Sequence, residues 1–110
     1  MLVVSDGNIT QFLNCKIGEM FGSQWQVATG SLDFYNCEIG NLYITDCDYT
    51  CHEGTVVNKI AFYPDQLSDV TKNSTITIKS GAKANITNEV KNSSKISIVV
   101  ESGGEVNYID

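Results

Sequence analysis

A seven-residue motif that occurs twice constrains this chain more than any other feature of its sequence. The two copies are residues 12–18 (FLNCKIG) and residues 34–40 (FYNCEIG), which lie 22 residues apart and agree at five of seven positions. A repeat of this length is one supersecondary unit that cannot bury its apolar face alone. The motif therefore predicts units that stack on one another.

Glycines recur along the chain at nearly the same interval. The steps between successive members are 23, 24, 27 and 22 residues for the series Gly7, Gly30, Gly54, Gly81 and Gly103. In the C-terminal half, residues 74–81 (STITIKSG) parallel residues 94–98 (SKISI). Their isoleucines alternate with Thr, Ser and Lys, which is typical of a half-buried strand. A short helical turn over residues 64–69 accounts for the longest step.

These patterns predict an all-β fold, a parallel β-helix or β-solenoid of about five coils with a period of about 22 residues, in a single domain over residues 1–110. Equivalent residues should then stack at the strand spacing of roughly 4.8 Å. Cys15 would lie under Cys37, and Asn14 under Asn36. Buried thiols of this kind behave as small apolar groups, and a disulfide between neighbouring coils is the alternative.

The Asn/Ser/Thr-rich, glycine-punctuated repeat resembles right-handed parallel β-helix proteins. In style it is similar to the shafts of bacteriophage tail fibres and tailspikes and to bacterial surface adhesins. The resemblance implies a homotrimer in which three chains pack side by side or intertwine. Because tailspike β-helices often hydrolyse glycans, a fragment of a glycan-processing lyase or hydrolase is the alternative. A bactofilin-like structural polymer is a second alternative.

Charge and the chain ends limit the partners that we expect. The chain has a net charge of −6, seven lysines and no arginine, which disfavours nucleic acid and anionic membranes as partners. It has no apolar stretch long enough for a membrane span and no signal-peptide pattern. The resemblance to fibres and adhesins implies a virion or cell-surface location, with the cytoplasm as the alternative. Both ends are apolar and lack a polar cap, which predicts a segment of a longer protein or a unit that oligomerises.

The densest polar stretch, residues 45–53, includes Cys47, Cys51 and the only histidine, His52. With Asp48 or Glu53 these residues would give four zinc ligands. Structural zinc sites usually have a second ligand pair downstream, and no Cys or His follows His52, so we predict no metal and no cofactor. Cys47 and Cys51 are then either a local disulfide or free thiols. A dyad of Cys51 and His52 is disfavoured because neighbours on a strand point to opposite faces.

Carbohydrate binding is the activity that the side chains favour, because sugars stack on aromatic rings among polar groups. The carboxylates are interpreted as solvated turn and edge residues, so we predict no catalytic residues and a non-enzymatic protein; they are Asp33, Glu38, Asp46, Asp48 and Glu53. Trp25 is also interpreted as a core or interchain residue. The predicted surface for a glycan or protein receptor consists of Trp25, Tyr43, Asp46, Asp48, Tyr49 and Tyr63.

Overall fold

The structure is a computed structural model and describes the whole chain except residues 1, 6–8, 22–29, 46 and 63–72. The described residues form mostly strands, as the sequence predicts. In chain order the elements are β1 (Leu2–Ser5), β2 (Ile9–Leu13), β3 (Lys16–Phe21), β4 (Ser31–Tyr35), β5 (Glu38–Tyr43), β6 (Asp48–Cys51), β7 (Val56–Ala61), β8 (Ser74–Ile78), β9 (Lys83–Thr87), α1 (Asn88–Lys91), β10 (Ile96–Val100) and β11 (Glu105–Ile109).

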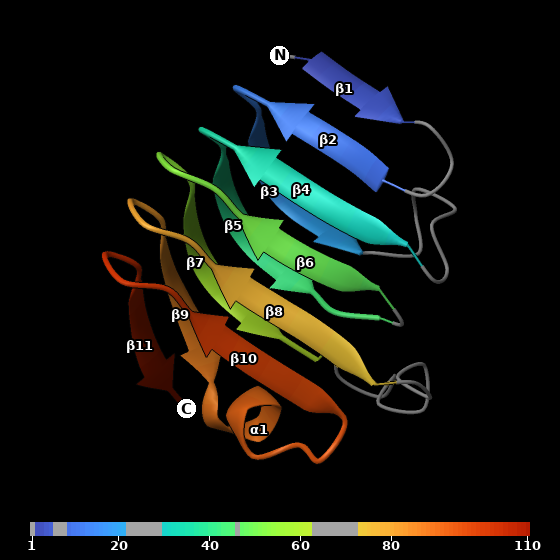
Figure 1. Cartoon of the computed structure of the whole chain (residues 1–110). Helices are drawn as coiled ribbons and strands as arrows, with labels where there is room; N and C mark the ends of the chain where they lie inside the picture. Colours follow the sequence, from blue (N-terminus) through green and yellow to red (C-terminus); the bar gives the residue numbers. More distant parts are fainter. Residues whose placement is uncertain (1, 6–8, 22–29, 46, 63–72) are drawn as a thin grey trace.

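From β2 onward the strands alternate between two facing sheets, and β1 lies beside β2 in the same sheet (Figure 1). One sheet has six strands in the order β1-β2-β4-β6-β8-β10, and the other has five in the order β11-β9-β7-β5-β3. Strand β1 is antiparallel to β2, and the other neighbours pair in parallel. The chain winds through about four turns with a period of about 22 residues. This architecture confirms the predicted β-solenoid, and each predicted repeat unit is one strand from each sheet.

The repeated motif sets the register between the first two coils. Phe12 pairs with Phe34 and Lys16 with Glu38 across the coils. Between these strands, Asn36 Nδ2 donates a hydrogen bond of 2.8 Å to Asn14 Oδ1. The two asparagines have φ values of 56° and 53°, a left-handed conformation that Asn tolerates better than most residues. The predicted stacking of Asn14 under Asn36 is therefore confirmed.

Inward-facing side chains stack in rows along the solenoid axis. In the six-stranded sheet the rows are Thr10–Leu32–Tyr49–Ile76–Ile98 and Phe12–Phe34–Cys51–Ile78–Val100. In the five-stranded sheet they are Ile17–Ile39–Val57–Ala84–Val106 and Met20–Leu42–Ile60–Ile86–Tyr108. The members in the middle coils are buried. Each large apolar side chain buried in this way contributes about 1.5–3 kcal/mol, so the rows form the core that holds the coils together.

Strands β3, β5 and β7 depart from simple alternation. In each of these strands two residues, rather than one, separate the inward-facing side chains. In β5, for example, two half-buried residues lie between the buried Ile39 and Leu42. Strand β9 has one intervening residue, so the register with β7 shifts between Val57 and Ile60. The side-chain amide of Asn85 in β9 donates a 2.9 Å hydrogen bond to the backbone carbonyl of Asn58 at this irregularity.

Helix α1 follows β9 and contacts β7, β9, β10 and β11. The Thr87 side chain caps its N-terminus by accepting a hydrogen bond from Val90 N, and Val90 is fully buried. No helix in the described part of the chain has the length and apolar character needed to cross a membrane. The helical turn predicted over residues 64–69 lies outside the described residues.

Gly40 provides a test of how closely the coils approach. A Cβ at this position would lie only 2.4 Å from the backbone oxygen of Gly18, whereas a Cβ on Gly18 would meet no atom within 4 Å. We expect Gly40→Ala to lower the free energy of unfolding by about 1–3 kcal/mol through overpacking. The matched variant Gly18→Ala should change it by less than about 0.5 kcal/mol. Urea unfolding followed by circular dichroism measures both, and equal effects would contradict the packing described for β3 and β5.

Candidate functional site

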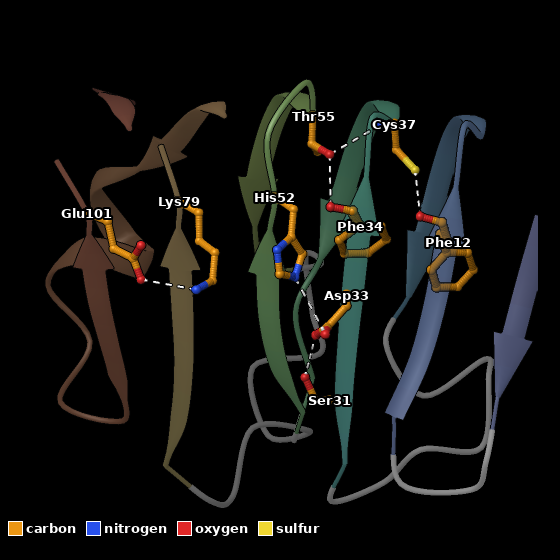
Figure 2. Close-up of polar contacts among 9 residues, drawn as sticks. All are labelled: Phe12, Ser31, Asp33, Phe34, Cys37, His52, Thr55, Lys79 and Glu101. Atoms are coloured by element: carbon orange, nitrogen blue, oxygen red, sulfur yellow. Dashed lines mark hydrogen bonds and ion pairs between the residues drawn. The ribbon is translucent and has the colours of Figure 1, made fainter. Parts of the chain in front are cut away.

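A row of polar and aromatic side chains lines the outer surface where the six-stranded sheet turns into the five-stranded one. This corner row consists of Tyr35, His52, Lys79 and Glu101, which follow residues that pair across β4, β6, β8 and β10. The rings of Tyr35 and His52 stack with centroids 3.9 Å apart. Lys79 Nζ lies 3.3 Å from Glu101 Oε2 (Figure 2). Together with Glu53 and Ser80, the row lines a shallow hollow of about 470 Å³.

Asp33 of β4 joins this row to the outer face of the sheet. Its Oδ2 lies 3.6 Å from His52 Nε2, and its Oδ1 accepts a 2.8 Å hydrogen bond from Ser31 Oγ (Figure 2). In a Ser-His-Asp triad the histidine lies beside the serine hydroxyl, whereas here the carboxylate lies between the hydroxyl and the imidazole. The cluster is therefore suited to joining strands and not to activating Ser31.

The inner side of the same corner carries a second row, Cys15–Cys37–Thr55–Ala82–Gly104. The backbone carbonyls of the first four members each accept a hydrogen bond from a backbone N–H of the next coil. These hydrogen bonds are Glu38 N to Cys15 O, Val56 N to Cys37 O, Lys83 N to Thr55 O and Glu105 N to Ala82 O. The Cys37 thiol donates to Phe12 O at 3.2 Å, and one coil later the Thr55 hydroxyl donates to Phe34 O at 3.0 Å (Figure 2). Thr55 Oγ1 also accepts from Cys37 N at 3.2 Å. This row confirms that Cys15 stacks under Cys37 and gives the thiols a structural role.

All four cysteines are buried and none is part of a disulfide, so the disulfides that the sequence left as alternatives are not formed. Burial raises the pKa of the Cys51 thiol to about 12, with smaller contributions from Cys37 and Asp33. Burial also raises the pKa of Cys37. Thiols are nucleophiles and metal ligands only as thiolates, so the raised pKa values disfavour both roles for Cys37 and Cys51.

Cys51 and His52 do not converge. Cys51 belongs to an inward row of the core and is fully buried, while the His52 ring lies outside on Tyr35. Among the residues that the structure describes, no three Cys, His, Asp or Glu side chains are grouped closely enough to hold a metal ion.

The structure places the predicted receptor-binding residues in different environments. Tyr49 is fully buried, and its hydroxyl accepts a 2.8 Å hydrogen bond from Thr45 N; the prediction that it lines an exterior face is wrong. Tyr43 is half-buried and donates a 3.1 Å hydrogen bond to Glu19 Oε2. Asp48 is exposed and accepts a 2.9 Å hydrogen bond from Thr75 N. Trp25, Asp46 and Tyr63 lie outside the described residues.

Tyr43 and Asp48 share one side of the solenoid, because Tyr43 ends β5 and Asp48 begins β6. The corner row lies at the other end of the strands, where β6 ends and β7 begins. Sequence reasoning missed the contact of His52 with Asp33. The polar alternation of β4 and β6 was the available signal, since it places Asp33 beside Thr50 on the outer face.

Comparisons of the chain with protein-family models, with curated proteins and with solved structures give no match.

The buried hydroxyl of Thr55 gives a stability prediction. Thr55→Val keeps the shape of the side chain but leaves the buried Cys37 N–H without its acceptor, which costs about 1–3 kcal/mol. Thr55→Ser keeps the hydroxyl and loses only a methyl group, so we expect a loss of about 1 kcal/mol or less. Urea unfolding compares the two variants. A valine variant as stable as the serine variant would show that the hydroxyl contributes nothing to this corner.

The raised pKa of Cys51 predicts slow alkylation and sensitivity to alkaline pH. At pH 8 the native thiol should react with iodoacetamide roughly a thousandfold more slowly than in the urea-unfolded chain, because its pKa of about 12 is well above the usual value of about 8.5. The folded protein holds this proton more tightly than the unfolded chain. The free energy of unfolding should therefore fall as pH rises from about 8.5 to about 12. Mass spectrometry of labelled peptides and unfolding at several pH values measure both effects.

Proposed function

We propose that this chain is a structural, receptor-binding β-solenoid segment of a viral tail fibre or tailspike, or of a bacterial surface adhesin. A stack of coils with side chains aligned in rows is a stiff element whose outer faces repeat along its axis. Such an element is suited to spacing and presenting binding residues. The acidic, arginine-free composition favours a protein or glycan receptor over nucleic acid.

The observation that carries this proposal is the exposed apolar surface of the last coil. In the described structure, β10 and β11 are edge strands. Val100 and Tyr108 continue the inward rows of Ile78 and Ile86, yet their side chains are 44% and 40% exposed. Edge strands with exposed apolar residues present unpaired backbone groups and favour association with further strands. This surface supports assembly of the chain with other copies.

The proposed assembly is a homotrimer at a virion or cell surface, as the fibre-like repeat implies, in which the last coils of the three chains pack against or intertwine with one another. The proposed receptor surface includes Tyr43 and Asp48, which share the β5–β6 side of the solenoid. Trp25, Asp46 and Tyr63 are proposed as further members from the sequence. Tyr49 is excluded because it is buried in the core.

Light scattering coupled to size exclusion tests the assembly. At micromolar concentration the wild-type chain should have close to three times its monomer mass of 12.0 kDa. Val100→Lys places a charge at the exposed end of the solenoid and should shift the protein to the monomer, because a buried unpaired charge strongly disfavours an interface.

The matched control is Ile9→Lys. Ile9 is 42% exposed, much like Val100, but it belongs to β2, near the opposite end of the solenoid. This variant should keep the wild-type mass. A monomeric wild-type protein would contradict the proposed trimer. Dissociation by the Ile9 change alone would contradict association through the last coil.

A further inference from the structure

We propose that two copies of this chain pair side by side, in antiparallel orientation, through the outer face of the five-stranded sheet (Figure 1). The pairing has a two-fold axis at Val56. It uses a different face from the exposed last coil, so it goes beyond the proposed trimer and does not depend on it. The residues that carry it form one outward row, which we call the charge ladder: Lys16, Glu38, Val56, Lys83 and Glu105.

The charge ladder crosses all five strands of the sheet. Each member pairs with the next one across neighbouring strands, in the order β3, β5, β7, β9 and β11. All five side chains are exposed. Lys83 Nζ lies 3.3 Å from Glu105 Oε2, and these side chains are still 65% and 67% exposed. Each of the two therefore has room for a second partner of opposite charge.

The order of the charges makes the ladder complementary to itself. From the first coil to the last it reads positive, negative, apolar, positive, negative, and in the opposite direction every sign is reversed. Antiparallel alignment therefore places Lys16 of one copy opposite Glu105 of the other, and Glu38 opposite Lys83. The match extends over all five strands, because both copies have the same strand spacing of roughly 4.8 Å. Parallel alignment in register would place like charges opposite one another, which disfavours it.

Val56 is the residue type that a two-fold axis favours at the centre of the ladder. A residue on the axis meets its own copy, so a charged side chain there would face the same charge. Val56 instead offers an apolar contact, and it is 46% exposed between Glu38 and Lys83. A single exposed valine is ordinary on a protein surface. Its place at the midpoint of an alternating row of charges is what indicates a symmetric contact.

Shallow hollows lie on both sides of the ladder at Val56. On the corner side, a hollow of about 430 Å³ is lined by Val56 together with Asn14 and Asn36. On the other side, a hollow of about 360 Å³ is lined by Val56 together with Gly18 and Gly40. The long lysine and glutamate side chains of a second copy therefore have space beside the central valine contact.

The pairing is expected to be weak. The chain has a net charge of −6, but the two lysines and two glutamates of the ladder cancel, so the contact itself is neutral. Five residues a side are far fewer than a stable interface uses, and exposed ion pairs each contribute little. We expect a dissociation constant of roughly 1 mM for single chains. The mass at micromolar concentration is then unaffected, while assemblies that present several ladders pair more tightly.

Sedimentation equilibrium in about 0.15 M salt tests the pairing by comparing the mass at about 20 µM and about 2 mM. The weight-average mass of the wild-type protein should rise by about 1.5-fold or more, from whichever assembly is present at low concentration. Glu38→Lys and Lys83→Glu each place two pairs of like charges in the contact. Each variant alone should rise by less than about 1.3-fold.

An equimolar mixture of the two variants separates pairing between copies from contacts within one chain. In a mixed pair, the lysine introduced by Glu38→Lys faces the glutamate introduced by Lys83→Glu, and all four charge pairs are again opposite in sign. At about 2 mM total the mixture should recover the wild-type rise in mass.

The matched control is Lys79→Glu. It changes the net charge as Lys83→Glu does, and it also removes an exposed ion pair of 3.3 Å, that of Lys79 with Glu101. Lys79 follows β8 of the other sheet, so this variant should keep the wild-type rise.

Three outcomes would overturn the pairing: no rise in the wild-type mass, equal effects of Lys79→Glu and Lys83→Glu, or a mixture that behaves like the separate variants. Val100→Lys, which tests the trimer, should leave the pairing intact. A wild-type protein that is monomeric at about 20 µM and still pairs at about 2 mM contradicts only the trimer.

Discussion

The structure depends on one constraint: each inward side chain must meet the equivalent side chain of the preceding coil. A backbone hydrogen bond that recurs at the corner keeps successive coils aligned. It runs from Glu38 N to Cys15 O in the first pair of coils and from Glu105 N to Ala82 O in the last pair. Where the corner is short, a left-handed asparagine makes the turn. Where it is one residue longer, a glycine with φ of 85–90° takes that role, as at Gly54 and Gly81. Change in corner length is therefore absorbed outside the core rows.

The repeated motif predicted the first two coils almost completely, because identical residues at equal spacing define a register. It did not place Tyr49, which the sequence reading assigned to a surface by its residue type. The pairing of the strands places Tyr49 correctly. Tyr49 pairs with Leu32 and Cys51 pairs with Phe34, and all four side chains face inward. A bulky ring fits there because the neighbouring inward residue, Cys51, is small.

Two features could not be read from a constant period. Strands β3, β5 and β7 carry an extra residue between their inward positions, so side chains there do not alternate strictly between the core and the surface. At the register shift between β7 and β9, the side-chain amide of Asn85 donates a hydrogen bond to the backbone carbonyl of Asn58. Between the second and third coils the spacing in the six-stranded sheet also shortens, so Asp33 pairs with Thr50, 17 positions later. A spacing of 22 would place Asp33 beside Thr55, a buried corner residue. The contact of Asp33 with His52 is visible only once this shorter spacing is known.

Polar and aromatic contacts also join the second and third coils, where the spacing is short. A solenoid is held together by contacts between neighbouring coils, so its stability is approximately a sum of local interfaces. Between coils two and three, the large Phe34 meets the small Cys51, and the corner lengthens by one residue. The hydrogen bond of the Thr55 hydroxyl on the inner side and the stacked rings of Tyr35 and His52 on the outer side add polar and aromatic contacts to the buried core rows at this interface.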